Sequence, residues 1–163
     1  MKAAGRPSSA ASRRRGLTLV ELMVVLVLLA VVLALAAPGL RAFVTGQRVK
    51  AMVFDLTSDL LRARSEALTR NASVTIAPRA GQWRNGWTVS AGADEILTRE
   101  AATEAVSFDG APSSIVFNVN GRVASPGADV RITVAGADGD DSQRRCIELD
   151  LSGRARAKTG ACT

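Results

Sequence analysis

The sequence predicts an α+β fold in which one long, kinked amino-terminal helix packs on an antiparallel β-sheet domain. Three observations support this prediction. Segment 17–37 is almost wholly apolar, apolar residues recur every three to four positions over 49–67, and the period changes to two after Asn71. The 163 residues therefore divide into a leader (1–16), an apolar helix segment (17–37), its amphipathic continuation (38–71) and a β-rich domain (72–163).

The leader accounts for the basic composition of the chain. The formal net charge is +6, and five basic residues with no acid lie in positions 1–15. Removing these five from the 21 basic residues leaves 16 against 15 acidic ones, a balance of +1. The overall charge therefore does not indicate a nucleic-acid-binding protein, because the basicity belongs to the leader.

The apolar segment is long enough to cross a bilayer. Only Thr18 and Glu21 are polar among its 21 residues. A helix rises about 1.5 Å per residue, so the segment spans roughly the 30 Å of the hydrocarbon core. Basic residues are concentrated before it, which places the amino terminus in the cytoplasm and the β-rich domain in the periplasm. We expect a single-pass protein of the bacterial inner membrane.

Three interpretations of this segment compete. A secretory signal cut after Ala36 would release a soluble periplasmic protein, since residues 34–36 resemble a small-residue cleavage site. An uncleaved signal anchor is the second interpretation. Neither accounts for Glu21, because a carboxylate costs about 2.5–3.5 kcal/mol near the centre of a membrane helix and less near its end.

The third interpretation rests on the stretch RGLTLVEL, residues 15–22, which resembles the class III signal of type IV pilins and type II secretion pseudopilins. The resemblance implies that a prepilin peptidase cuts after Gly16 and methylates the new amino terminus at Leu17. Glu21 then becomes the fifth mature residue, whose carboxylate pairs in this family with the terminal ammonium of a neighbouring subunit and sets the register. Pro38 matches the family's helix-kinking proline, whereas Leu17 replaces the usual phenylalanine.

Beyond Pro38 the helical pattern resumes and continues to about Arg70. Oppositely charged residues at Asp59–Arg62 and Glu66–Arg70 are spaced to pair on the solvent-facing side of the helix. Asn71 is the expected carboxy-terminal stop. The predicted core face consists of Val49, Met52 or Val53, Leu56, Leu60, Ala63 and Ala67.

The β-rich domain shows alternating patterns separated by turn residues. Asn120-Gly121 is a strong signal for a hairpin turn. The predicted strands cover 73–77, 87–90, 95–99, 114–119, 122–124, 130–135, 144–151 and 156–159.

Four stretches resemble the GspH/FimT family of type IV pilin-like proteins, which includes secretion pseudopilins and minor pilins. They are LRARSEALTRNASVTI, WRNGWTV, SIVFNVNGRV and RRCIELDLSGRARAKTGAC. The cysteine-containing tail is more similar to FimT/FimU minor pilins than to secretion-system H proteins. The resemblance implies the type IV pilin-like fold, in which the first half of the long helix is transmembrane.

The register of the last strand pair is restricted by the parity of its apolar residues. Ile147, Leu149 and Leu151 share one face. A two-residue turn would place arginines opposite them, because a one-residue slip moves every side chain to the other face. We therefore expect a three-residue loop at 153–155 that pairs Leu151 with Ala157.

This register also sets Cys146 opposite Cys162, within the Cα spacing that a disulfide accepts. In a chain whose bulk is exported, two cysteines indicate a disulfide. Closing a loop of this length stabilises a fold by about 3 kcal/mol in the chain-entropy model. A pair of free thiols is the alternative.

The resemblance extends to a possible contact with DNA. Residues 153–156 match the GRxR stretch through which some FimT-type pilins bind DNA, which makes Arg154 and Arg156 the candidate phosphate contacts. A solvated hairpin is the alternative, because Glu148 and Asp150 lie nearby and no aromatic residue is adjacent to stack bases.

Together these features predict a non-enzymatic minor pilin or pseudopilin. The chain has no His or Tyr and no HExxH, P-loop, GxSxG or CxxC motif, so we expect no catalytic residues, metal or cofactor. The expected partners are prepilin peptidase, the other pilins or pseudopilins of a filament, the inner membrane and, through the last hairpin, DNA. The rival is a soluble periplasmic protein released by a conventional signal peptidase.

Overall fold

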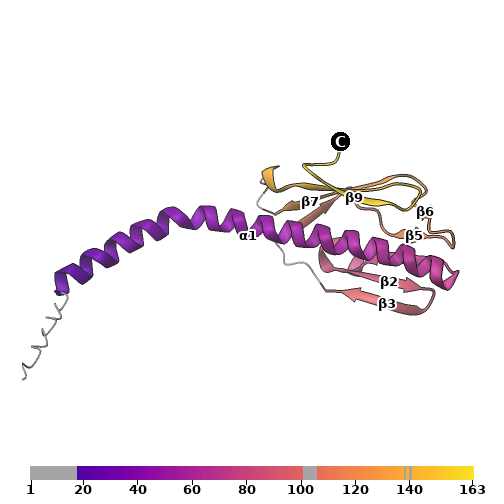
Figure 1. Cartoon of the computed structure of the whole chain (residues 1–163), viewed down its shortest axis with the longest axis horizontal. Helices are drawn as coiled ribbons and strands as arrows, with labels where there is room; N and C mark the ends of the chain where they lie inside the picture. Colours follow the sequence, from indigo (N-terminus) through magenta and orange to yellow (C-terminus); the bar gives the residue numbers. More distant parts are fainter. Residues whose placement is uncertain (1–17, 101–105, 138, 140) are drawn as a thin grey trace, which may run out of the picture. The chain divides into compact units, whose positions relative to one another are not determined.

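The computed structural model describes residues 18–100, 106–137, 139 and 141–163. They form two units that meet between Pro38 and Gly39. Helix α1, Leu19–Arg70, belongs to both units, and its 52 residues stay helical through Pro38 (Figure 1). A kink at Pro38 remains a prediction. Gly16 and Leu17, the predicted cleavage residues, lie outside the described part of the chain.

In the first unit, α1 presents an apolar surface that is not covered by the protein. Leu19–Ala36 has a mean hydropathy of 3.1, and none of it is buried. Its length and composition suffice for one membrane crossing. The prediction of an apolar first half of the helix is confirmed.

In the second unit, α1 buries the face that the sequence predicts. The helix ends where Asn71 adopts a positive φ of 49°, and the Ala72 N–H donates to the Ala67 carbonyl at 3.3 Å. These are the features of a Schellman stop, so Asn71 ends the helix as predicted. The buried residues of this face are Val49, Val53, Leu56, Leu60, Ala63 and Ala67.

The first sheet has five antiparallel strands in the order β3-β2-β1-β5-β6. The predicted Asn120-Gly121 turn joins β5 to β6, where the Gly121 N–H donates to the Asn118 carbonyl at 2.8 Å. Short helices η1 (Arg79–Gly81) and η2 (Trp83–Asn85) connect β1 to β2. The strands are β1 (Val74–Pro78), β2 (Trp87–Ala91), β3 (Asp94–Arg99), β5 (Ile115–Phe117) and β6 (Val123–Ser125).

The second sheet has four antiparallel strands in the order β4-β7-β8-β9. Sequence analysis missed β4 (Val106–Asp109), which pairs with β7 and places Val106 opposite Gly136. The four residues of β4, VSFD, alternate apolar and polar side chains, but so short a run is a weak signal by itself, and the strand depends on a distant partner. The other strands are β7 (Val130–Gly136), β8 (Arg145–Leu149) and β9 (Ala155–Thr159), with helix η3 (Asp141–Gln143) before β8.

The carboxy-terminal half of α1 lies along both sheets and shares one core with them (Figure 1). Trp87 of β2 is fully buried, with ring centroids 6.2 Å from both Trp83 and Phe108. Since Phe108 belongs to β4, Trp87 links the two sheets. Aromatic pairs at this separation add to the stabilisation that comes from area burial.

Asp59 of α1 is buried, with 4% of its surface exposed. Its carboxylate accepts hydrogen bonds from Trp87 Nε1 at 2.9 Å and from Arg99 Nε and Nη2, both at 3.1 Å. The predicted solvent-facing pair with Arg62 is therefore wrong, because Asp59 points into the domain toward β2 and β3. The other predicted pair is present, with Arg70 Nε 2.7 Å from Glu66.

Candidate functional site

The first turn of α1 positions Glu21. The Thr18 hydroxyl accepts a hydrogen bond from the Glu21 N–H at 3.2 Å, and the Thr18 carbonyl accepts one from the Leu22 N–H at 3.1 Å. Thr18 is therefore the N-cap of the helix. Sequence reasoning missed this role, although Thr-x-x-Glu is the signature of a capping box.

Glu21 lies where the partial positive charge of a helix amino terminus favours an acidic side chain. Among the described residues, its carboxylate has no ion-pair partner, and the residue is exposed. The apolar surface of Leu19–Ala36 surrounds it along the helix. A carboxylate in such a setting is available to a cation supplied from outside the described chain.

The β8–β9 hairpin has a register that differs from the predicted one. Leu149 pairs with Ala155, and Cys146 pairs with Lys158, so β9 is shifted by four residues along β8. The loop is closed by the Asp150 N–H, which donates to the Arg154 carbonyl at 3.2 Å. The chain therefore turns at residues 151–153, before the predicted 153–155. Because the shift is an even number of residues, each side chain keeps its predicted face.

A disulfide joins Cys146 and Cys162, whose Cα atoms are 4.9 Å apart, although the two residues are not strand partners. After β9 ends, the chain folds back so that the Cys162 N–H donates to Thr133 Oγ1 at 3.0 Å. Thr133 is the β7 partner of Cys146. The segment after β9 therefore crosses back over β8 toward β7, and this brings the sulfur atom of Cys162 to that of Cys146.

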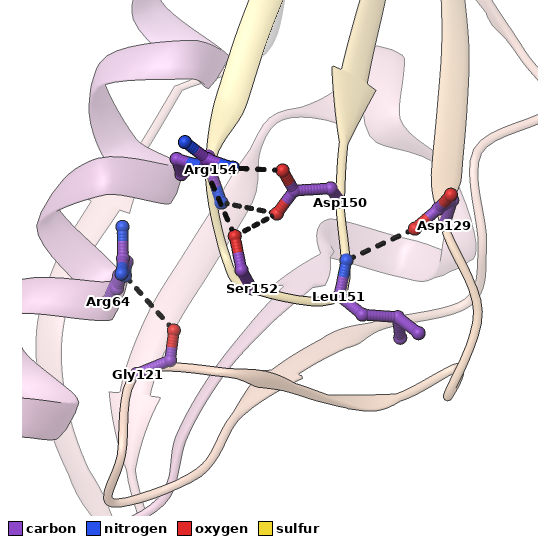
Figure 2. A network of polar contacts seen from close by, with 7 residues as sticks. All are labelled: Arg64, Gly121, Asp129, Asp150, Leu151, Ser152 and Arg154. Atoms are coloured by element: carbon purple, nitrogen blue, oxygen red, sulfur yellow. Dashed lines mark hydrogen bonds and ion pairs between the residues drawn. The ribbon is translucent and has the colours of Figure 1, made fainter.

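The tip of the hairpin is organised by Asp150 (Figure 2). Its carboxylate accepts hydrogen bonds from the Ser152 hydroxyl and the Arg154 N–H, and Arg154 Nε lies 3.4 Å from Asp150 Oδ2. The hydrogen bond from Ser152, followed by that from the Arg154 main chain, lowers the pKa of Asp150 to about 2. Arg154 therefore has an acidic partner, which reduces its availability for phosphate.

Arg156 has a different setting from Arg154. It is exposed on β9 opposite Glu148 and has no ion pair at bonding distance among the described residues. Lys158 binds Glu148 at 2.6 Å. The hydrogen bond from Lys158 and the nearby charges of Arg131 and Arg156 lower the pKa of Glu148. Three cations therefore lie around Glu148, but Asp129 and Asp150 lie beside Arg131 and Lys158 and balance part of this positive charge.

The hairpin tip packs on the rest of the domain at Gly121, whose hydrogen bond with Arg64 is drawn in Figure 2. Arg64 Nε of α1 donates to the Gly121 carbonyl at 3.0 Å, and a Cβ at Gly153 would lie 2.2 Å from the same oxygen. The Leu151 N–H donates to Asp129 Oδ1 at 3.1 Å, and the Leu151 carbonyl accepts a hydrogen bond from the Val123 N–H at 3.1 Å. No sequence signal links Gly153 to Gly121, because their contact depends on how the two hairpins pack.

Comparison with known proteins gives a family match, a sequence motif and two similar solved structures. The chain matches the family described as type II transport protein GspH over residues 53–153 and the prokaryotic N-terminal methylation motif over residues 11–37. No curated protein sequence matches it.

Among solved structures, the fold is similar to that of the type IV minor pilin FimU of Pseudomonas aeruginosa in two crystal forms. The P21 form has a TM-score of 0.59 at 19% identity, covering 69% of this chain and 89% of FimU. The P65 form has a TM-score of 0.56 at 20% identity, covering 67% and 91%. The GspH match spans more than half of the chain, and the methylation motif precedes it. The chain therefore belongs to the GspH family of type IV pilin-like proteins.

Proposed function

We propose that this protein is a non-enzymatic filament subunit, a minor pilin or pseudopilin that is made as a precursor. Prepilin peptidase cuts it after Gly16 and methylates Leu17, and the subunit then enters a type IV pilus or a type II secretion pseudopilus. The observation that carries the proposal is the position of Glu21 in the first turn of an exposed apolar helix, where its carboxylate has no ion-pair partner among residues 18–163 as far as they are described.

The physical argument concerns what covers the helix. An apolar surface of this size requires a membrane or other apolar helices around it. The inner membrane provides that cover before assembly, with the amino terminus in the cytoplasm and the β-rich domain in the periplasm. The helices of neighbouring subunits provide it afterwards. Cleavage creates an ammonium group at Leu17, and the same group on a neighbouring subunit is a cation that can pair with Glu21.

Mass spectrometry of the mature amino terminus tests this proposal. We expect a protein that begins with N-methyl-Leu17 and remains with the membrane. A Gly16→Arg variant is the control, because it removes the cleavage residue and should leave the leader attached. A mature protein that begins at Ala37 and is released in soluble form would contradict the proposal and support the signal-peptidase alternative.

DNA contact is a second candidate function, favoured by the exposure of Arg156, which forms no ion pair among the described residues. We expect Arg156→Ala to weaken DNA binding and to flatten its salt dependence, because one phosphate contact is lost. Arg154→Ala should have the smaller effect, since Asp150 already neutralises Arg154. Unchanged binding in a variant carrying both substitutions, with the disulfide intact, would remove this candidate.

A further inference from the structure

A groove lies between the middle of α1 and strand β9. Its cavity volume is about 310 Å³. Val53, Phe54 and Thr57 line it from the helix, and Ala157 and Thr159 line it from the strand. We call this feature the β9 groove.

One wall of the β9 groove is the open edge of a sheet. β9 is the last strand in the order β4-β7-β8-β9. At one end of β9 the Arg154 carbonyl accepts a hydrogen bond from the Asp150 N–H, and at the other end the Gly160 N–H donates to the Arg144 carbonyl. Hydrogen-bonded pairs alternate with non-bonded pairs along an antiparallel ladder. Ala155, Ala157 and Thr159 therefore direct their main-chain N–H and C=O groups away from β8. In the described part of the chain, no strand pairs with that side of β9.

The other wall is apolar and uncovered. Phe54 is 71% exposed, which is unusual for so large an apolar side chain beside an open strand. Leu61 and Leu68 follow at seven-residue intervals and are 47% and 51% exposed. Seven residues are close to two helical turns, so the three side chains form one stripe along the same flank of α1. Ala157 is small, so it does not obstruct the strand edge.

The charge around the β9 groove is positive and unbalanced. Lys50 and Arg145 line it, and neither forms an ion pair among the described residues. Lys158 also contributes to the lining, but its ammonium is bound to Glu148. Arg145 Nη1 donates to the Arg144 carbonyl at 2.7 Å, but no described carboxylate balances the charge of Arg145 or Lys50. Two such cations beside an apolar wall and an open strand edge complement an extended segment that carries both acidic and apolar side chains.

We propose that the β9 groove binds an extended, acidic segment of a neighbouring filament subunit, which pairs with β9 and lengthens the β4-β7-β8-β9 sheet by one strand. Main-chain groups of Ala155, Ala157 and Thr159 hold the incoming strand. An apolar side chain of that strand packs on Phe54, and its carboxylates face Lys50 and Arg145. The identity of the partner rests on the proposed function, whereas the chemistry of the groove does not.

A peptide probe tests the groove directly. The full-length protein in detergent micelles is titrated with a short synthetic peptide in which glutamate and valine alternate. We expect slower amide hydrogen exchange at Ala157 and Thr159, whose N–H groups the peptide would engage. The same peptide with alternate main-chain nitrogens methylated should give no protection, because it has lost its strand-pairing donors. Unchanged exchange at saturating peptide would overturn the proposal.

Two groove variants and one matched control complete the test. Lys50→Glu combined with Arg145→Glu should weaken peptide binding about tenfold, since two exposed charge contacts become repulsive. Ala157→Pro should abolish binding while preserving the β8–β9 ladder, because its N–H points outward. Arg62→Glu, also on α1 and exposed but outside the groove, should bind the peptide like the wild type. Equal affinity in all variants would overturn the proposal.

Failure of this inference and failure of the proposed function give different results. If filament incorporation is normal but the peptide does not bind, the groove proposal is wrong and the filament role stands. If the peptide binds but the protein is released with Ala37 at its amino terminus, the groove stands and its assignment to a filament neighbour is wrong.

Discussion

Gly153, in the turn between β8 and β9, packs directly against the main chain of Gly121. A Cβ at Gly153 would lie 2.2 Å from the Gly121 carbonyl oxygen, which also accepts a hydrogen bond from Arg64 Nε at 3.0 Å. The last hairpin, the β5–β6 turn and α1 therefore meet at one carbonyl group, and Figure 2 shows its bond with Arg64. This contact holds the tip of the candidate DNA-contact hairpin together with the two main-chain hydrogen bonds of Leu151.

Replacing Gly153 by alanine is expected to destabilise the protein by about 2 kcal/mol or more. Alanine would have to adopt a left-handed backbone conformation, and the Gly121 carbonyl would have to move away from the new Cβ. Gly153 has a φ of 79°. Gly92→Ala is the matched control, since Gly92 has a φ of 60° and no atom within 4 Å of an added Cβ. Chemical unfolding followed by tryptophan fluorescence measures both variants. Equal losses of stability would contradict a steric role for Gly121.

The buried Asp59 is expected to be a larger determinant of stability than its neighbour Asp55. Asp59→Asn should lower the free energy of unfolding by about 2 kcal/mol. This loss is smaller than that expected on breaking a fully buried ion pair, because solvent screens the partly exposed Arg99. Asp55 lies 3.9 Å from Arg99 and is more accessible, so Asp55→Asn should have a smaller effect. The same unfolding assay compares them, and similar losses would show that the Trp87–Asp59–Arg99 contacts contribute little.

Asp150 predicts a specific acid dependence of stability. Its pKa falls from 3.8 to about 2 in the folded chain, so the folded state favours the ionised carboxylate. The stabilisation is fully present above pH 3.8 and is lost as the pH falls through about 2. The stability difference between wild type and Asp150→Asn should therefore shrink over this interval. A difference that stays constant with pH would contradict the assignment.

The disulfide is expected to stabilise the hairpin end of the domain. Cys162→Ser should lower the free energy of unfolding by about 3 kcal/mol, as the chain-entropy model predicts for a loop of this length. A reductant should lower the unfolding midpoint of the wild type to that of the variant and leave the variant unchanged. If the reductant shifts both proteins equally, the loss does not come from the disulfide.

Glu21 is expected to act in assembly and not in membrane retention. Glu21→Leu should remain in the membrane, because the apolar segment becomes more hydrophobic, but it should be lost from filaments. Cell fractionation and filament shearing measure the two properties separately. Glu21→Asp is the conservative control and should retain more incorporation than the leucine variant. Normal incorporation of Glu21→Leu would rule out the pairing role.

Local pattern was sufficient for much of the fold. The apolar run, the helical period over 49–67, the stop at Asn71 and the turn at Asn120-Gly121 each depend on neighbouring residues, and each agrees with the structure. The α+β class followed from them, whereas the pilin-like arrangement of helix and sheets was implied by the resemblance to the GspH/FimT family. The capping role of Thr18 was equally local, and its Thr-x-x-Glu signature was present in the sequence.

The sequence by itself thus determined the buried apolar face of the elements that have a regular period, because burial imposes that period on neighbouring positions. Only the tertiary structure decided how far β9 slides along β8, since a shift of four residues leaves every face unchanged. It also decided the partners of Asp59, the pairing of β4 with β7 and the contact of Gly153 with Gly121. Each joins residues far apart in the chain, and the packing of whole elements brings them together.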